Sequence, residues 1–161
     1  MRLKAREVLD DCRDALDELY EIGLQGSKWK RRWFAAITLL RAVGHVLNRE
    51  VKSYSKDVVL KEKEAWEIYK KENAKIFNFI KSERDNVLKQ YLFGAGQGIK
   101  IVFSAPLNAP DCKCESEWSY PVLAGDFSGK DQREIISEGI MFWEKYIQKV
   151  ESLLEMENGT S

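Results

Sequence analysis

The sequence has few of the residues on which many functional sites depend. It contains one histidine, His45, so a metal cluster built from several histidines is excluded and any histidine acid–base role falls to this residue. Three cysteines, an odd number, do not make the disulfide framework of a small secreted protein. No apolar run reaches the roughly 18 residues of a membrane-spanning helix, and acidic residues follow the basic N-terminus where a signal peptide would be apolar. We therefore expect a cytoplasmic protein with no membrane partner.

An excess of charge of one sign is also missing. Lys plus Arg and Asp plus Glu both number 26, whereas proteins that bind nucleic acid by non-specific phosphate attraction are typically basic. A local basic groove remains compatible with a net charge of zero. The signatures of serine hydrolases, cysteine proteases and Walker-type phosphate loops are absent. Cys112 and Cys114 lack the other two ligands of a closed zinc site, so we expect neither a metal nor a cofactor.

What the chain does contain is helical periodicity. Its 161 residues, 44% of them hydrophobic, suit one domain with a sizeable core. Apolar residues recur at three-and-four spacing in four segments, residues 3–22, 29–51, 56–93 and about 130–155. As one helix, the third segment would be about 57 Å long, so we predict a break at residues 71–73.

The residues between the last two helical segments show a different pattern. Alternation over residues 99–104 and 118–124 predicts two strands. The predicted fold is therefore mainly α, a four- or five-helix bundle with a short β-hairpin-like excursion at about 94–127, before the last helix. We expect a single domain over residues 1–156 and a disordered tail over 157–161.

Two motifs are compatible with both a functional and a structural interpretation. The second helix opens Lys28-Trp29-Lys30-Arg31-Arg32-Trp33, which is either a stacking platform for nucleic acid or a helix start whose tryptophans enter the core. The glycine-rich segment 94–98 is either a phosphate loop or a connector. Because a dinucleotide loop follows a strand and precedes a helix, and this segment does the reverse, a connector is favoured.

The third helical segment places charge on its apolar face. Periodicity predicts that Arg84 shares a face with Ile80, Leu88 and Tyr91, and arginine is almost never buried without a partner. Its guanidinium either holds a phosphate or pairs with Asp85 or a carboxylate on a facing helix. Both interpretations stay open.

A second group of candidate residues lies on the helix predicted at 29–51. Arg41 and His45 are four residues apart, so they share a helix face and call for acidic partners or an anionic ligand. The alternative for His45 is a surface histidine hydrogen-bonded to a neighbour.

The Glu83-Arg84-Asp85-Asn86 cluster in an all-helical chain resembles the HEPN superfamily of nucleotide-binding domains. That family's motif is an arginine, usually followed by a polar residue, and a histidine four to six positions later. Arg84 matches the arginine, Asp85 and Asn86 are polar followers, and Tyr91 falls where the toxin branch of the family has a tyrosine. The histidine position is Lys89 on one spacing and Tyr91 on the longer one, which departs from the motif.

The resemblance implies a function. Family members that keep both motif residues are metal-independent ribonucleases whose site forms across a homodimer. The resemblance therefore implies a homodimer that binds RNA or a nucleotide in a toxin–antitoxin or defence setting, with an antitoxin-like protein partner. Arg84 and Tyr91 would be the catalytic residues, and Asp85, Asn86, Arg41 and His45 would bind the ligand.

The missing histidine bears on cleavage. Lysine and tyrosine have pKa values near 10, poorly matched to acid–base work at neutral pH, so we expect binding without cleavage. His45 replaces the missing histidine only if its helix faces Arg84. The alternatives are an active ribonuclease and a non-catalytic protein-interaction module.

Overall fold

The computed structural model describes residues 2–21, 26–104 and 113–158. Within these ranges the chain is mainly helical, with a two-stranded antiparallel hairpin before the last helix, which confirms the predicted fold class. The elements in chain order are α1 (Lys4–Leu19), α2 (Gly26–Val51), α3 (Lys56–Glu72), α4 (Ala74–Gln90), β1 (Gly98–Phe103), β2 (Cys114–Ser119) and α5 (Gln132–Asn158).

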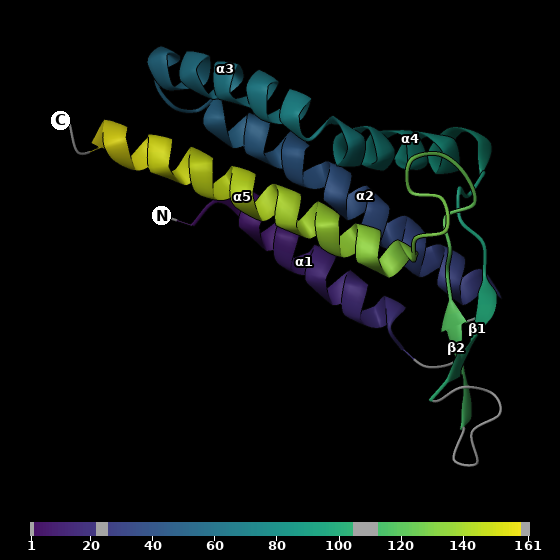
Figure 1. The fold of residues 1–161 in the computed structure, drawn as a ribbon. Helices are drawn as coiled ribbons and strands as arrows, with labels where there is room; N and C mark the ends of the chain where they lie inside the picture. The colour runs from purple at the N-terminus through teal and green to yellow at the C-terminus, as the bar shows by residue number, and fades with distance from the viewer. Residues whose placement is uncertain (1, 22–25, 105–112, 159–161) are drawn as a thin grey trace.

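The long helices α2 and α5 form the centre of the bundle (Figure 1). Helix α1 packs against both of them on one side. Helices α3 and α4 follow each other along the other side, and the hairpin projects from one end (Figure 1). The predicted break is confirmed, because α3 ends at Glu72, α4 begins at Ala74, and only Asn73 separates them.

The core is rich in aromatic side chains. Trp33 of α2 and Trp143 of α5 are 0% and 1% exposed. Trp29 is also buried and stacks on Tyr120, with ring centroids 5.5 Å apart, while Lys28 is exposed. The start of α2 is therefore a core element whose cation faces solvent, as the structural interpretation of this motif predicted.

Several predicted boundaries were wrong. Helix α4 ends at Gln90 rather than residue 93, because Tyr91 takes a left-handed backbone with φ of 53° that ends the helix. Helix α5 continues through Asn158, so it includes the first two residues of the predicted tail. Residues 159–161 lie outside the described ranges.

The hairpin also differs from its prediction. Strand β2 begins at Cys114 and ends at Ser119, whereas the sequence pattern placed it at 118–124. The glycine-rich segment is a connector held by backbone hydrogen bonds, from the Gly96 amide to Pro121 and from Leu123 to the Gly94 carbonyl. Cys114 is exposed, and Cys112 lies outside the described ranges.

Among the described helices, none has the length and apolar character needed to cross a membrane.

Candidate functional site

Helix α4 turns Glu83, rather than Arg84, into the core. Its buried residues are Ile76, Ile80, Glu83 and Val87, and Glu83 is 4% exposed. The Trp33 indole Nε1 donates to Oε1 of Glu83 at 2.9 Å, and the Gly94 amide donates to the same oxygen at 2.9 Å. A Cβ on residue 94 would lie 2.5 Å from Oε2 of Glu83, so a larger residue there would require the carboxylate to move from its two donors.

The predicted apolar face of α4 was therefore wrong in part, because Ile80 is buried as predicted but the charged residue in the core is Glu83 in place of Arg84. Leu88 and Tyr91, predicted to be core residues, are 52% and 70% exposed. Glu83 is stable in the core because two donors, the Trp33 indole and the Gly94 amide, bind its carboxylate. The spacing of apolar residues cannot predict a buried charged residue of this kind. The indole of Trp33, which needs an acceptor once buried, is the clue that the sequence did contain.

Arg84 lies at the edge of this buried face, with 24% of its side chain exposed. Its Nη1 is 2.9 Å from Oδ1 of Asp85, and the ammonium of Lys89 donates to Oδ2 of Asp85 at 3.3 Å. Desolvation alone would raise the pKa of Asp85, but the Lys89 hydrogen bond and the Arg84 charge outweigh it and lower that pKa. The structural partner predicted for Arg84 is thus present.

Arg41 and His45 of α2 face the same region of α4. The Arg41 guanidinium carbon lies 5.4 Å from the centre of the Phe77 ring. Burial, followed by the charge of Arg84, lowers the pKa of Arg41. Burial, followed by the charges of Arg41 and Arg84, lowers the pKa of His45. Two arginines and the one histidine therefore lie within electrostatic reach of one another, and the helix of His45 does face Arg84.

Arg41 is the least compensated of these groups. Among the described residues it has no ion-pair partner, and its buried Nε has no hydrogen-bond partner. Asp85 does act on Arg41 electrostatically, yet its carboxylate is already paired with Arg84 and Lys89. A partly buried guanidinium without a carboxylate of its own is suited to an anion.

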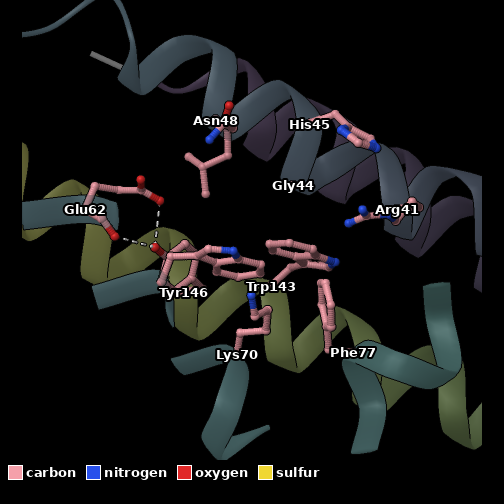
Figure 2. Close-up of a pocket in the computed structure, with 11 residues that line it drawn as sticks. Arg41, Gly44, His45, Asn48, Glu62, Lys70, Phe77, Trp143 and Tyr146 are labelled. Carbon is pink, nitrogen blue, oxygen red and sulfur yellow. Dashed lines mark hydrogen bonds between the residues drawn. The ribbon is translucent and has the colours of Figure 1, made fainter. Parts of the chain in front are cut away.

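A pocket of about 290 Å³ opens beside these residues. Figure 2 shows the side chains around it, which come from α2, α3, α4 and α5. Its lining includes Arg41, His45 and Asn48 of α2, Glu62, Trp66 and Lys70 of α3, Phe77 of α4, and Trp143 and Tyr146 of α5. The rings of Trp66 and Trp143 stack at 5.5 Å, and Trp66 is the more exposed of the two.

The one acid in the pocket lining is already engaged. The Tyr146 hydroxyl donates to Oε1 of Glu62 at 2.7 Å, and Glu62 is 7% exposed (Figure 2). Lys70 stands at the rim and pairs with Glu67 at 2.8 Å. A neighbouring hollow shares Lys70 with the pocket and adds Lys71 and Lys81. Basic side chains therefore gather where α3 and α4 meet.

Two predicted site residues lie apart from this group. Asn86 is exposed on α4. Tyr91 packs against Phe93, with centroids 5.2 Å apart, and the Lys30 ammonium lies 6.0 Å from its ring centre. Lys30 and Arg41 are about 16 Å apart along α2, so the structure does not bring Tyr91 to the Arg41–His45–Arg84 cluster.

No group of three or more His, Cys, Asp or Glu side chains that could hold a metal ion gathers within residues 2–21, 26–104 and 113–158.

No family model, curated protein or solved structure matches the chain. The HEPN relationship therefore stays a prediction, supported by the local pattern around Arg84.

Proposed function

We propose that this protein is a HEPN-like helical bundle that binds RNA or a nucleotide at the cluster of Arg41, His45 and Arg84. The observation that carries the proposal is Arg41, which has no ion-pair partner among the described residues and lies within electrostatic reach of Arg84. In this proposal the two guanidiniums bind phosphate, and the adjoining pocket takes the base.

Electrostatics support the phosphate part of the proposal. Two cations close together in a partly desolvated site repel each other, which is why Arg84 contributes to lowering the pKa of Arg41. A phosphate between them removes that repulsion and accepts paired hydrogen bonds from a guanidinium. The zero net charge of the chain means that affinity comes from this local cluster rather than from a general basic surface.

The pocket wall supports the base part. The half-buried ring of Trp66 lines the pocket, and stacking of a nucleobase on an aromatic side chain contributes about 1–3 kcal/mol per base. The exposed amide of Asn48 can both donate to and accept from a base edge. Lys70 at the rim lies where a further phosphate would be held.

Fluorescence anisotropy tests the proposal with a labelled single-stranded RNA and a labelled mononucleotide. We expect Arg41→Gln and Arg84→Gln each to weaken binding by about tenfold or more, and each to reduce the salt slope by about one. Arg31→Gln is the matched control, because Arg31 is an exposed arginine near the start of the same helix α2. Wild-type affinity in both Arg41→Gln and Arg84→Gln would overturn the proposal.

A second function, metal-independent RNA cleavage, is favoured by the place of His45. Its lowered pKa leaves the imidazole neutral at pH 7 and able to accept the proton of a ribose 2′-hydroxyl. The 2′-oxygen then attacks the adjacent phosphorus and the bond to the 5′-oxygen breaks. The departing 5′-oxygen takes a proton from water, which leaves a 2′,3′-cyclic phosphate and a 5′-hydroxyl, and the imidazolium of His45 returns its proton to solvent. Incubation with labelled RNA in the presence of EDTA tests this. Cleavage of the RNA by the wild type, but not by His45→Gln, supports this function. RNA that stays intact with the wild type rules it out.

The Arg84–Asp85 ion pair favours the non-catalytic alternative, in which the arginine is structural and the chain is an interaction module. Neither binding nor cleavage would then respond to Arg84→Gln. A toxin–antitoxin or defence setting, with an antitoxin-like partner, belongs to the leading proposal and depends on the family resemblance alone.

A further inference from the structure

The hairpin is a two-stranded ribbon that projects from the end of the bundle (Figure 1). Its strands pair antiparallel in a register that places Ile101 opposite Ser116. A ribbon of two strands is marginally stable in water, and three or more strands with an apolar face are needed for independent stability. Among the described residues, β1 pairs with no strand other than β2, so its second edge is open.

One face of the ribbon is apolar and uncovered. Side chains alternate along β1, so Ile99, Ile101 and Phe103 share a face, and they are 62%, 58% and 43% exposed. The other face carries an ion pair, with the Lys100 ammonium 3.6 Å from Oε1 of Glu117. An exposed apolar strand with an open edge is a template for a further strand.

The two edges of the ribbon are protected to different degrees. Strand β2 carries Glu115 and Glu117, and both are exposed. Strand β1 carries a single charge, Lys100. Antiparallel pairing of β2 with a second β2 about Ser116 would set Glu115 opposite Glu117, and like charges directly opposite each other are destabilising. The available edge is therefore that of β1.

We propose that β1 pairs antiparallel with β1 of a second copy of this chain, about a two-fold axis at Ile101, to form a four-stranded sheet. This register sets Ile101 opposite its own copy and Ile99 opposite Phe103, so the apolar faces of the two ribbons become continuous. Lys100 then lies opposite Val102. A register centred on Lys100 would set two lysines against each other, which excludes it. The interface is isologous, as closed two-fold dimers require.

Sedimentation velocity over the micromolar to millimolar range tests this interface, with circular dichroism as the check that each variant is folded. We expect the wild type to dimerise and Ile101→Glu to weaken dimerisation at least about tenfold, because two isoleucines that face each other across the two-fold axis are replaced by two facing carboxylates. Ser116→Glu is the matched control. It adds the same charge on the same face, but on the protected strand, and should dimerise as the wild type does.

A charge-pairing experiment distinguishes a weakened interface from a variant that fails to fold. An equimolar mixture of Ile101→Glu and Ile101→Lys should form a heterodimer at concentrations where each variant alone is monomeric, because the glutamate and lysine then lie opposite each other. A wild type that stays monomeric, or a mixture that forms no heterodimer, overturns the proposal. The open edge of β1 would then be a candidate site for a strand of another protein. The interface is independent of the anion site, since Arg41→Gln is expected to leave dimerisation unchanged.

Discussion

The buried carboxylate of Glu83 provides the sharpest test of the structure. Glu83→Ala removes the acceptor of two donors, the buried Trp33 indole and the partly buried Gly94 amide. A buried donor left without a partner costs about 1–3 kcal/mol, so loss of the Trp33 bond alone should lower the free energy of unfolding by that amount. The partly buried Gly94 amide adds less, because water can reach it. The void left by the shorter side chain adds to this loss.

Glu83→Gln should lower the free energy of unfolding by less than Glu83→Ala does. Oε1 of Glu83 accepts from both donors at 2.9 Å, and Oε2 accepts only a weaker bond from the Gly94 amide at 3.2 Å. Glutamine keeps an oxygen at the first position and sets an amide donor against the Gly94 N–H at the second. We expect a loss of about 1–3 kcal/mol, smaller than for alanine.

Urea unfolding measures these losses, with an unchanged m-value as the sign that the native and denatured states keep their compactness. The control is Glu64→Ala, an exposed glutamate in α3, which should change stability by no more than about 0.5 kcal/mol. A double-mutant cycle with Trp33→Phe isolates the indole bond and should give a coupling of about 1.5–3 kcal/mol. A loss below about 1 kcal/mol for Glu83→Ala, or an additive cycle, would refute the buried-acceptor interpretation.

Two further predictions concern helix α2. Gly44→Ala should lower the free energy of unfolding by about 1–3 kcal/mol in the same urea assay, because its Cβ would lie 2.5 Å from Cη2 of Trp143; an unchanged stability would mean that the indole moves away freely. His45 is the only histidine, so its ring protons give one NMR titration curve, which should have its midpoint below 6.5. Because the folded pKa is lowered, this group contributes stability that is present above about pH 6.5 and lost as pH falls through the folded pKa. Arg41→Gln should move the midpoint upward, and a midpoint at or above 6.5 in the wild type would contradict the clustering of cations around His45.

Much of the helical fold could be predicted because its signal is local. Apolar spacing indicated the helices, and the need for a break between α3 and α4 followed from the length of the segment. Strand β2 was misplaced because almost all of it is exposed on both faces, so its residues do not alternate between apolar and polar.

The site was harder to predict, since it depends on how helices meet. Periodicity assigns a residue to a face only to within one position, and the charged residue in the core is Glu83 in place of Arg84. The pairing of Arg41 and His45 along one helix was predictable from their spacing. Their approach to Arg84 was not, because no local pattern specifies which face of α4 packs on α2.

Glu83 and Arg84 are neighbours on α4, so the hydrogen bonds of the first determine where the second points. The Trp33 and Gly94 donors hold α4 in one rotational setting about its own axis. Arg84, about 100° around the helix, therefore lies at the edge of the core, paired with Asp85 and within electrostatic reach of Arg41 and His45. If the proposed function holds, a change at Glu83 will therefore alter ligand affinity by moving the Arg84 guanidinium, although Glu83 itself does not contact the ligand.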